Sequence, residues 1–292
     1  MSRYIGLIGY PVKHSISPYF QQAALDYYKL DIRYEAWETA PTQLEDVVNS
    51  LRKAQNLGAN VTVPYKQAVL PMLDEIDDLA GSIGAVNTIV KKDNRLLGFN
   101  TDAYGFMEAL DKEGHFAPEG KRVVMLGAGG VARAVGLVLL RQKVASLAIS
   151  NHRFERAGAL AESLAGYVKG ASPSSGDWEP NVTAFHWENL NSAKTLDQCD
   201  LIVHCTTIGM KGGPQEGKSA LSLDVIPKNI LVYDVVYNPP LSPLLKLAQK
   251  AGANILGGLA MLVYQGAASF KLCTGKEAPI DIMFNKAREM LT

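Results

Sequence analysis

The stretch KRVVMLGAGGVARAVGLVLL, residues 121–140, decides the fold of the second half of this chain. It runs from a short β-branched strand through a glycine turn directly into an apolar helix. Gly127 allows the tight turn, Gly129 lets a backbone approach a pyrophosphate, and Ala132 permits close packing of the helix. The helix N-terminus then faces the phosphates. The stretch predicts a dinucleotide site, against the alternative of an ordinary glycine turn, and its residues are Gly127, Ala128, Gly129, Gly130, Val131 and Ala132.

The end of the following strand selects between the two nicotinamide dinucleotides. An NAD site carries an acidic side chain about 20 residues further on, which binds the ribose 2′-hydroxyl. Here the strand SLAIS runs into Asn151, His152, Arg153 and Arg156, with no Asp or Glu at the strand tip. Planar guanidinium groups suit a 2′-phosphate, so the sequence favours NADP. The alternative is a solvated helix start, to which the nearby Glu155 would contribute.

Short β-branched runs alternate with helical patterns along the whole chain. The first half contains YIGLIG (4–9), IRYEAW (32–37) and GANVTV (58–63), and the second half continues through SLAIS, DLIVHC and ILVYDVV. This rhythm is typical of crossover units that build mostly parallel sheets. We therefore expect an α/β protein with two domains, an N-terminal α/β domain with a mostly parallel sheet and a Rossmann-type domain. The aperiodic segment KGASPSSGDWEPN (169–181) predicts a surface loop.

The composition restricts the kind of partner. Lys and Arg number 29, as do Asp and Glu, so there is no basic field to hold nucleic acid or an anionic membrane. No apolar run approaches the ~18 residues of a membrane helix, and the N-terminus lacks a signal-peptide pattern. Three cysteines without a Cys-x-x-Cys spacing argue against disulfides and structural zinc. We therefore expect a cytoplasmic protein with a small-molecule partner.

The histidines do not indicate a metal site. His115, His186 and His204 show no spacing to one another or to carboxylates that is typical of metal ligands. We therefore expect no metal.

Lys66 follows a strand that breaks at Pro64, within NVTVPYKQAV (60–69). An ordinary surface lysine lies on a helix face among glutamates, whereas this one stands at the expected mouth of a sheet, where α/β enzymes keep their chemistry. In GYPVKHSISP (9–18), the hydroxyls of Ser15 and Ser17 are two residues apart and can both donate to a carboxylate. Taken alone, this spacing also suits a helix N-cap.

Seven segments in this order resemble the shikimate dehydrogenase family. They are GYPVKHSISP (9–18), NVTVPYK (60–66), GAVNT (84–88), GFNTD (98–102), GAGGVARA (127–134), DVVYNPPLSPLL (234–245) and GGLAMLVYQG (257–266). The resemblance spans nearly the full chain and is far more specific than a glycine fingerprint alone. It implies an NADP-dependent enzyme that interconverts 3-dehydroshikimate and shikimate, acting as a monomer or homodimer.

The resemblance also implies roles for individual residues. Lys66 and Asp102 would be the catalytic pair, because oxidising a secondary alcohol needs a group that takes the hydroxyl proton as well as a hydride acceptor. The implied substrate-binding residues are Ser15, Ser17, Thr62, Lys66, Asn87, Asp102, Tyr237 and Gln265. The implied cofactor-binding residues beyond the glycine turn are Asn151, His152, Arg153, Arg156, Thr206, Gly258 and Met261.

Four of these residues have a simpler interpretation. Asp102 suits a helix N-cap, Lys66 an electrostatic anchor, Tyr237 a sheet edge, and Met261 the start of an apolar helix.

The implied layout has a substrate-binding catalytic domain over 1–104, completed by C-terminal helices over 260–292, and a Rossmann dinucleotide-binding domain over 105–259, with substrate in a cleft between them. The chain departs from the family at His152, since many members have Asn-Arg-Thr at this place. An NAD-preferring quinate/shikimate dehydrogenase is therefore one alternative. A non-catalytic relative that senses a nucleotide or a shikimate-like acid is another, and loss of Lys66 or Asp102 would mark it.

Overall fold

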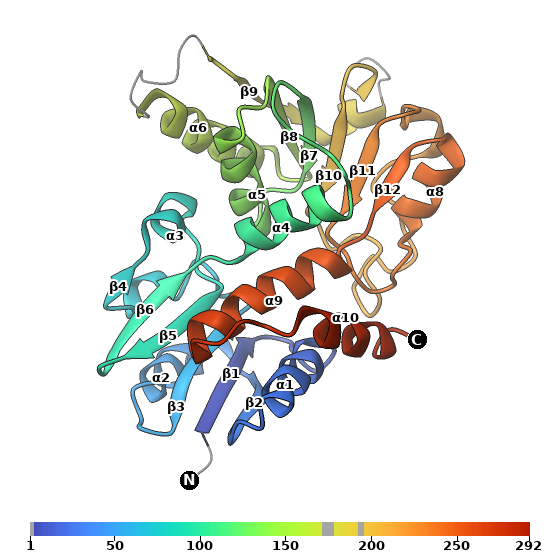
Figure 1. The fold of residues 1–292 in the computed structure, drawn as a ribbon. Coiled ribbons are helices and arrows are strands. Elements are labelled where there is room, and N and C mark those ends of the chain that lie inside the picture. Colours follow the sequence, from blue (N-terminus) through green and yellow to red (C-terminus); the bar gives the residue numbers. More distant parts are fainter. Residues whose placement is uncertain (1–2, 171–177, 192–195) are drawn as a thin grey trace. The chain divides into compact units, whose positions relative to one another are not determined.

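The computed structural model describes residues 3–170, 178–191 and 196–292 (Figure 1). The chain divides into two compact units: unit 1 comprises Met1–Phe106 and Ala260–Thr292, and unit 2 comprises Met107–Leu259. It passes from unit 1 to unit 2 within helix α4 (Asp102–Lys112) and returns at the start of helix α9 (Leu259–Thr274). Each unit has its own six-stranded sheet in the part of the chain that is described.

Unit 1 contains a mixed, mostly parallel sheet, as the sequence predicts. Its strands are β1 (Arg3–Gly9), β2 (Ile32–Glu38), β3 (Asn56–Val61), β4 (Glu75–Ile76), β5 (Thr88–Lys92) and β6 (Arg95–Phe99), in the order β2-β1-β3-β5-β6-β4. Only β5 runs antiparallel to its neighbours, β3 and β6. The carboxyl ends of β1, β3 and β6 therefore lie at the same edge as the amino end of β5.

The helices of unit 1 pack on this sheet and on one another. They are α1 (Ser17–Tyr27), α2 (Leu44–Ser50), α3 (Asp78–Ile83), the first turns of α4, α9 and α10 (Ile280–Glu289), with 3-10 turns η1 (Pro41–Gln43) and η2 (Leu70–Met72). Figure 1 shows α10 beside α1. Just after α1, the Tyr28 hydroxyl donates to the Glu277 carbonyl at 2.9 Å. Fully buried Ile8, Ile89 and Leu96 contribute to the core between the sheet and α2.

Unit 2 has the strand order of a Rossmann fold. Its strands are β7 (Arg122–Leu126), β8 (Ser146–Asn151), β9 (Asn181–His186), β10 (Leu201–His204), β11 (Leu231–Asp234) and β12 (Asn254–Leu256), in the order β12-β11-β10-β7-β8-β9. All adjacent pairs are parallel. The order reverses between β7 and β10, and ligands bind beyond the carboxyl ends of the strands at such a switch point.

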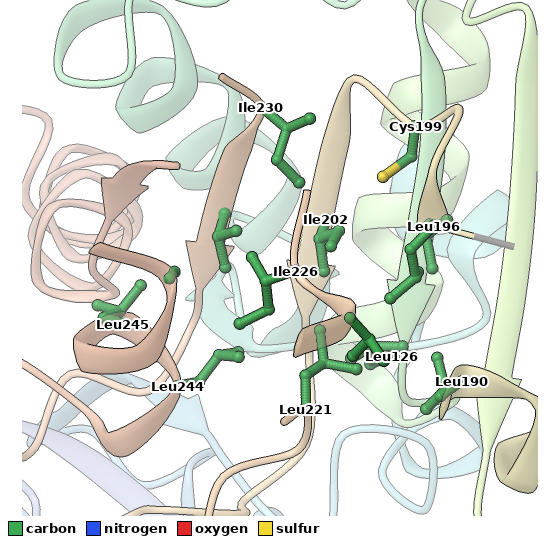
Figure 2. Close-up of a cluster of buried hydrophobic side chains, with 14 residues drawn as sticks. Leu126, Leu190, Leu196, Cys199, Ile202, Leu221, Ile226, Ile230, Leu244 and Leu245 are labelled. Atoms are coloured by element: carbon green, nitrogen blue, oxygen red, sulfur yellow. The ribbon is translucent and has the colours of Figure 1, made fainter. Parts of the chain in front are cut away.

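The helices of unit 2 are α5 (Gly130–Arg141), α6 (Phe154–Gly170) and α8 (Pro243–Ala251), with 3-10 turns η4 (Trp187–Asn191) and η5 (Leu223–Val225). Strands β10 and β11 are buried along their whole length, which explains why their residues are apolar without alternation up to the last one, His204 in β10 and Asp234 in β11. Figure 2 shows the core on one face of this sheet, where Ile202 of β10 and Leu244 and Leu245 of α8 converge.

The loop predicted over 169–181 differs from the structure at its start. Helix α6 continues to Gly170, and β9 begins at Asn181. Residues 171–177 lie outside the described residues. Among the helices that the structure describes, none combines the length and the apolar character needed to cross a membrane.

Candidate active site

The edge of the unit 1 sheet where β1, β3 and β6 end collects most of the predicted catalytic and substrate-binding residues. Ser15 and Ser17 come after β1, Thr62 and Lys66 come after β3, Asn87 directly precedes β5, and Asp102 opens α4 after β6. These segments lie at one edge of the sheet because β5 runs antiparallel to β3 and β6. Because β5 is antiparallel, Asn87, which precedes it, lies at the same edge of the sheet as the residues that follow β1, β3 and β6.

Lys66 and Asp102 form an ion pair at this edge. The distance from Lys66 Nζ to Asp102 Oδ2 is 2.6 Å, and the side chains are only 12% and 5% exposed. The Lys66 carbonyl accepts the Val86 N–H at 2.7 Å, and the preceding Tyr65 donates its hydroxyl to the Thr39 carbonyl at 2.6 Å. Because desolvation offsets most of the attraction in such a buried pair, stability alone is a weak reason for keeping it. The pair is therefore a candidate for chemistry.

The second oxygen of the Asp102 carboxylate is also held. Asn87 Nδ2 donates to Asp102 Oδ1 at 2.9 Å, and the same amide nitrogen lies 2.9 Å from Thr101 Oγ1 and 3.2 Å from Gln265 Oε1. Asn87 Oδ1 in turn accepts the Thr101 N–H at 2.8 Å. The structure thus joins Lys66, Asp102, Asn87 and Gln265, four of the predicted residues, in one hydrogen-bonded cluster.

The N-cap interpretation of Asp102 is wrong, because another residue caps α4. Asn100 Oδ1 accepts the backbone N–H groups of Asp102 at 3.0 Å and of Ala103 at 3.4 Å. An Asn that accepts hydrogen bonds from the first turn is a typical cap. The sequence analysis overlooked Asn100, although its place just before the helix is a recognisable signal. Capping by Asn100 leaves the Asp102 carboxylate to Lys66 and Asn87.

A buried polar group behind the site ties Asn87 to the sheet. Asn60 Nδ2 of β3 lies within hydrogen-bond distance of the Asn87 carbonyl oxygen, Thr88 Oγ1 and Ser269 Oγ, at 3.2, 3.1 and 2.7 Å. Its Oδ1 accepts the Tyr34 hydroxyl at 2.8 Å. Burial raises the pKa of Tyr34 well above its ordinary value, so this phenol remains a donor. Asn60 therefore links β2, β3, β5 and α9 directly beneath Asn87.

Gln265 reaches the cluster because α9 approaches α4 closely. A Cβ on Gly105 of α4 would lie 2.7 Å from both the backbone nitrogen of Gln265 and the backbone carbonyl oxygen of Met261. The Gln265 side chain also donates to the Leu262 carbonyl at 2.7 Å. Only glycine at position 105 allows this approach, which brings a residue from the end of the chain to Asn87.

The two predicted serines lie at the start of α1. Ser15 Oγ accepts the Ser17 N–H at 3.3 Å, and Ser17 is the first residue of α1 and buried. Helix α1, described throughout, has no side-chain hydrogen bond at its N-cap position, Ile16. Of the two serines, only Ser15 therefore makes a cap-like hydrogen bond, which it accepts from the Ser17 N–H. A hydroxyl that accepts one hydrogen bond can still donate its own hydrogen.

In unit 2 the two glycines of the dinucleotide turn, Gly127 and Gly129, have different roles. Gly127 has φ +119°, and a Cβ there would lie 2.8 Å from the Cys205 carbonyl oxygen, so the protein itself requires this glycine. Gly129 has φ −89°, and a Cβ there would meet no atom within 4 Å. Gly129 is also the N-cap of α5, without a side-chain hydrogen bond. Open space above uncapped helix N–H groups fits a bound pyrophosphate.

The residues predicted to bind the 2′-phosphate lie at the carboxyl end of β8. Asn151 donates to the Arg153 carbonyl at 2.9 Å, and the exposed Arg153 and Arg156 occupy the turn and the start of α6. The His152 ring stacks on Trp187 of η4, with centroids 3.9 Å apart and an interplanar angle of 29°. Trp187 lies far along the chain, so the sequence analysis could not pair it with His152.

The remaining predicted cofactor residues follow the other strands of the same sheet. Thr206 follows β10, Tyr237 follows β11 and is partly exposed, and Gly258 follows β12. Parallel strands bring these three positions to the carboxyl edge of the unit 2 sheet, where the glycine turn also lies. Met261 differs, since it is buried in α9 and belongs to unit 1. Across the described ranges, no group of three or more His, Cys, Asp or Glu side chains could hold a metal ion.

Two family models match the chain. The model described as the shikimate dehydrogenase substrate binding domain matches residues 7–89, and the model described as the shikimate 5′-dehydrogenase C-terminal domain matches residues 258–284. A curated relative from Methanopyrus kandleri, named shikimate dehydrogenase (NADP(+)), is 40% identical over 288 residues, which cover 98% of this chain and 95% of the relative.

Solved structures of the same kind superimpose over essentially the whole chain. A shikimate dehydrogenase in complex with NADP+ has a TM-score of 0.89 and 36% identity, covering 100% of this chain and 96% of that one. Shikimate 5-dehydrogenase from Thermus thermophilus, in complex with NADP(H) and shikimate, has a TM-score of 0.84 and 34% identity, covering 99% of this chain and 100% of that one.

The two glycines of the turn predict opposite phenotypes. Gly127→Ala introduces strain at a positive φ and a clash with the Cys205 carbonyl, so we expect a loss of about 1–3 kcal/mol in unfolding free energy. Gly129→Ala meets no protein atom, so its unfolding free energy should stay within about 0.5 kcal/mol of the wild type. Binding of a dinucleotide, probed with NADP+, should instead weaken roughly tenfold, which is about 1.4 kcal/mol.

Urea unfolding and calorimetric titration measure the two effects separately. The expectation for Gly129 fails if Gly129→Ala binds NADP+ as the wild type does, or if it is destabilised as strongly as Gly127→Ala.

Proposed function

This chain belongs to the shikimate dehydrogenase family, and on that premise we propose that Lys66 and Asp102 are its catalytic pair. The protein is an NADP-dependent oxidoreductase that interconverts 3-dehydroshikimate and shikimate. The observation that supports the proposed pair is its ion pair of 2.6 Å, almost buried and held on both carboxylate oxygens. A non-catalytic relative would have no reason to keep it.

The chemistry divides between the cofactor and the protein. NADPH, when bound, supplies the hydride that reduces a ketone to a secondary alcohol. Lys66 Nζ carries three hydrogens, of which one is directed at Asp102 Oδ2, so another is free to be donated to the carbonyl oxygen as that oxygen becomes a hydroxyl. In the oxidative direction the same nitrogen takes the hydroxyl proton. Asp102, which is itself held by Asn87, keeps the lysine in place during both transfers.

The hydrogen bonds of the two side chains support Lys66 as the member of the pair that moves the proton. Asp102 already accepts from Lys66 on Oδ2 and from Asn87 on Oδ1, so its oxygens are engaged on both sides. Lys66 is the more exposed partner, at 12% against 5% for Asp102. We assign proton transfer to Lys66 and its orientation to Asp102.

Substrate recognition follows from the same edge of the unit 1 sheet. The hydroxyls of Ser15 and Ser17 would donate to the substrate carboxylate, and Thr62, Asn87, Asp102 and Gln265 would bind its ring hydroxyls. Each hydrogen bond lost with a missing substrate hydroxyl would weaken binding by about 0.5–1.5 kcal/mol. Specificity would therefore rest on polar side chains of unit 1.

Unit 2 would hold the cofactor. The open space at Gly129 and the uncapped start of α5 suit the pyrophosphate, and Arg153 and Arg156 beside β8 suit the 2′-phosphate. His152 would present a ring already stacked on Trp187, in place of the arginine that many family members carry. Thr206 and Gly258 would serve the nicotinamide end. Units 1 and 2 thus correspond in function to a substrate-binding catalytic domain and a dinucleotide-binding domain.

We further propose that the protein works in the cytoplasm as a monomer or homodimer. Cys199, Cys205 and Cys273 are all free thiols, and burial raises the pKa of each above its ordinary value. Thiols of this kind suit a reducing compartment.

The activity and its selectivity are measured by absorbance of the reduced nicotinamide with shikimate or quinate, each with NADP+ or NAD+. We expect rapid reduction with shikimate and NADP+, because Arg153 and Arg156 lie at the β8 tip without an acidic residue at the strand end. Turnover mainly with quinate or with NAD+ would contradict this expectation. Silence in all four mixtures would contradict catalysis altogether.

Two substitutions test the proposed pair. Lys66→Met removes the proton donor and should lower kcat by roughly two to four orders of magnitude. Asp102→Asn keeps the shape of the side chain and the Asn100 cap while removing the charge that orients Lys66, so a large loss of kcat is also expected. The matched control is Asp78→Asn, since Asp78 is an exposed acid in the first turn of α3.

The control should retain wild-type turnover, and all three variants should retain NADP+ affinity by calorimetry. Undiminished kcat in Lys66→Met would remove the catalytic assignment.

The basic residues at the β8 tip predict the cofactor preference. Arg153→Ala and Arg156→Ala each remove a guanidinium from the proposed 2′-phosphate site, so NADP+ affinity should fall by roughly tenfold in at least one variant. Affinity for NAD+, which lacks that phosphate, should hardly change. Equal losses for both dinucleotides, measured by calorimetric titration, would instead indicate a general electrostatic or structural effect.

A further inference from the structure

A histidine and an aspartate form a fully buried pair at the carboxyl edge of the unit 2 sheet. His204 is the last residue of β10 and Asp234 the last residue of β11, and the two are partners in the strand register. His204 Nδ1 lies 2.8 Å from Asp234 Oδ1, and neither side chain is exposed at all. Polar groups buried to this degree are kept where their hydrogen bonds are complete or where they have a function.

The hydrogen bonds of Asp234 define the state of the imidazole. Asp234 Oδ1 also accepts the Val236 N–H at 3.0 Å, and Oδ2 accepts the hydroxyl of Ser242 at 2.5 Å. Ser242 is at the same time the N-cap of α8, where its Oγ accepts the Leu245 N–H at 3.2 Å. Because the carboxylate accepts on both oxygens, the hydrogen between the pair belongs to His204 Nδ1. Nε2 of a neutral ring is then an acceptor.

The other side of the ring reaches the proposed cofactor site. His204 Nε2 lies 2.5 Å from Thr206 Oγ1, which also accepts the Ile208 N–H at 3.2 Å. The Thr206 methyl carbon Cγ2 lies 3.2 Å from the position that a Cβ on Gly127 would take. A continuous chain of contacts therefore runs from the start of α8 through Asp234 and His204 to the dinucleotide turn.

The same atoms exclude a nucleophilic triad. The Ser242 hydroxyl donates to Asp234 and not to the imidazole, and Ser242 is fully buried. The neighbouring Cys205 is no better a nucleophile, because burial raises the pKa of its thiol far above neutrality. The role of His204 must therefore be sought through Thr206.

We propose that His204 is a positioning residue for the cofactor, which fixes Thr206 as a hydrogen-bond acceptor. With the imidazole neutral and its hydrogen on Nδ1, the Thr206 hydroxyl donates to His204 Nε2, and one lone pair of Oγ1 accepts the Ile208 N–H. The remaining lone pair of Oγ1 accepts an N–H from the cofactor, and the carboxamide of its nicotinamide carries that kind of donor. This inference rests on the proposed function of Thr206 as a cofactor residue.

A double-mutant cycle on NADP+ affinity tests the inference. His204→Gln and Thr206→Val should each raise the Kd for NADP+ roughly tenfold, the effect of losing one well-placed hydrogen bond. The double variant should bind no more weakly than Thr206→Val alone, because His204 acts through that hydroxyl. In the matched control, Thr207→Val on the same loop, the effect of His204→Gln should persist in full.

The outcomes separate this inference from the proposed function. If Thr206→Val leaves the Kd unchanged, the cofactor role of Thr206 is wrong and the inference falls with it. If Thr206→Val weakens binding but the effect of His204→Gln adds to it in full, only the inference is wrong. Shikimate affinity of the cofactor-free protein should stay at the wild-type value in every folded variant.

A second measurement needs no substitution at His204 in the protein under test. In ¹⁵N NMR spectra of wild-type protein, the His204 ring should carry its hydrogen on Nδ1 only, and the Nε2 signal should shift when NADP+ is added. The signal can be assigned by its loss in His204→Asn. In Thr206→Val the shift on NADP+ addition should vanish. A ring with hydrogen on Nε2, or an Nε2 signal that ignores NADP+, would overturn the inference.

Discussion

The ion pair of Lys66 with Asp102 is the interaction on which the catalytic arrangement of unit 1 depends. An ammonium and a carboxylate this little exposed are tolerated only when both are paired and hydrogen-bonded. The structure meets that condition with Asn87 on the second carboxylate oxygen and Asn60 beneath Asn87. Polar residues from β3, from the segment just before β5 and from α9 thus support one charge pair, and the Asn100 cap leaves Asp102 free to take part in it.

Both sheets solve the same problem of bringing distant residues to one edge. In unit 2 all strands are parallel, so the residues that follow them meet without further arrangement. In unit 1 the reversed β5 contributes Asn87 from the segment before the strand. The buried pair of His204 and Asp234 shows the consequence, since two strand-terminal residues of adjacent parallel strands become hydrogen-bond partners.

The secondary-structure elements and the architecture of both sheets were predictable from the sequence, and the errors have two causes. The strand, glycine turn and helix at 121–140, the mostly parallel sheet and the Rossmann fold are confirmed. The N-cap interpretation of Asp102 was wrong because two candidate caps, Asn100 and Asp102, stand close together in the sequence, and only the backbone geometry distinguishes them. His204 was set aside because its partner, Asp234, is 30 residues away. Trp187 was not identified because its stacking partner, His152, is also distant in the sequence.

Features that depend on local chemistry were predictable from the sequence alone: the glycine turn, the alternation of strands and helices, and the residue types available for acid–base chemistry. Only the tertiary structure decided which of these residues meet. Lys66 and Asp102 are 36 positions apart, and Asn87 and Gln265 are 178 apart. Such pairs form through strand order, strand direction and the close approach of α9 to Gly105, and none of these is a property of a short stretch of sequence. The physical reason is that a hydrogen bond requires two groups within about 3 Å, a condition that packing imposes.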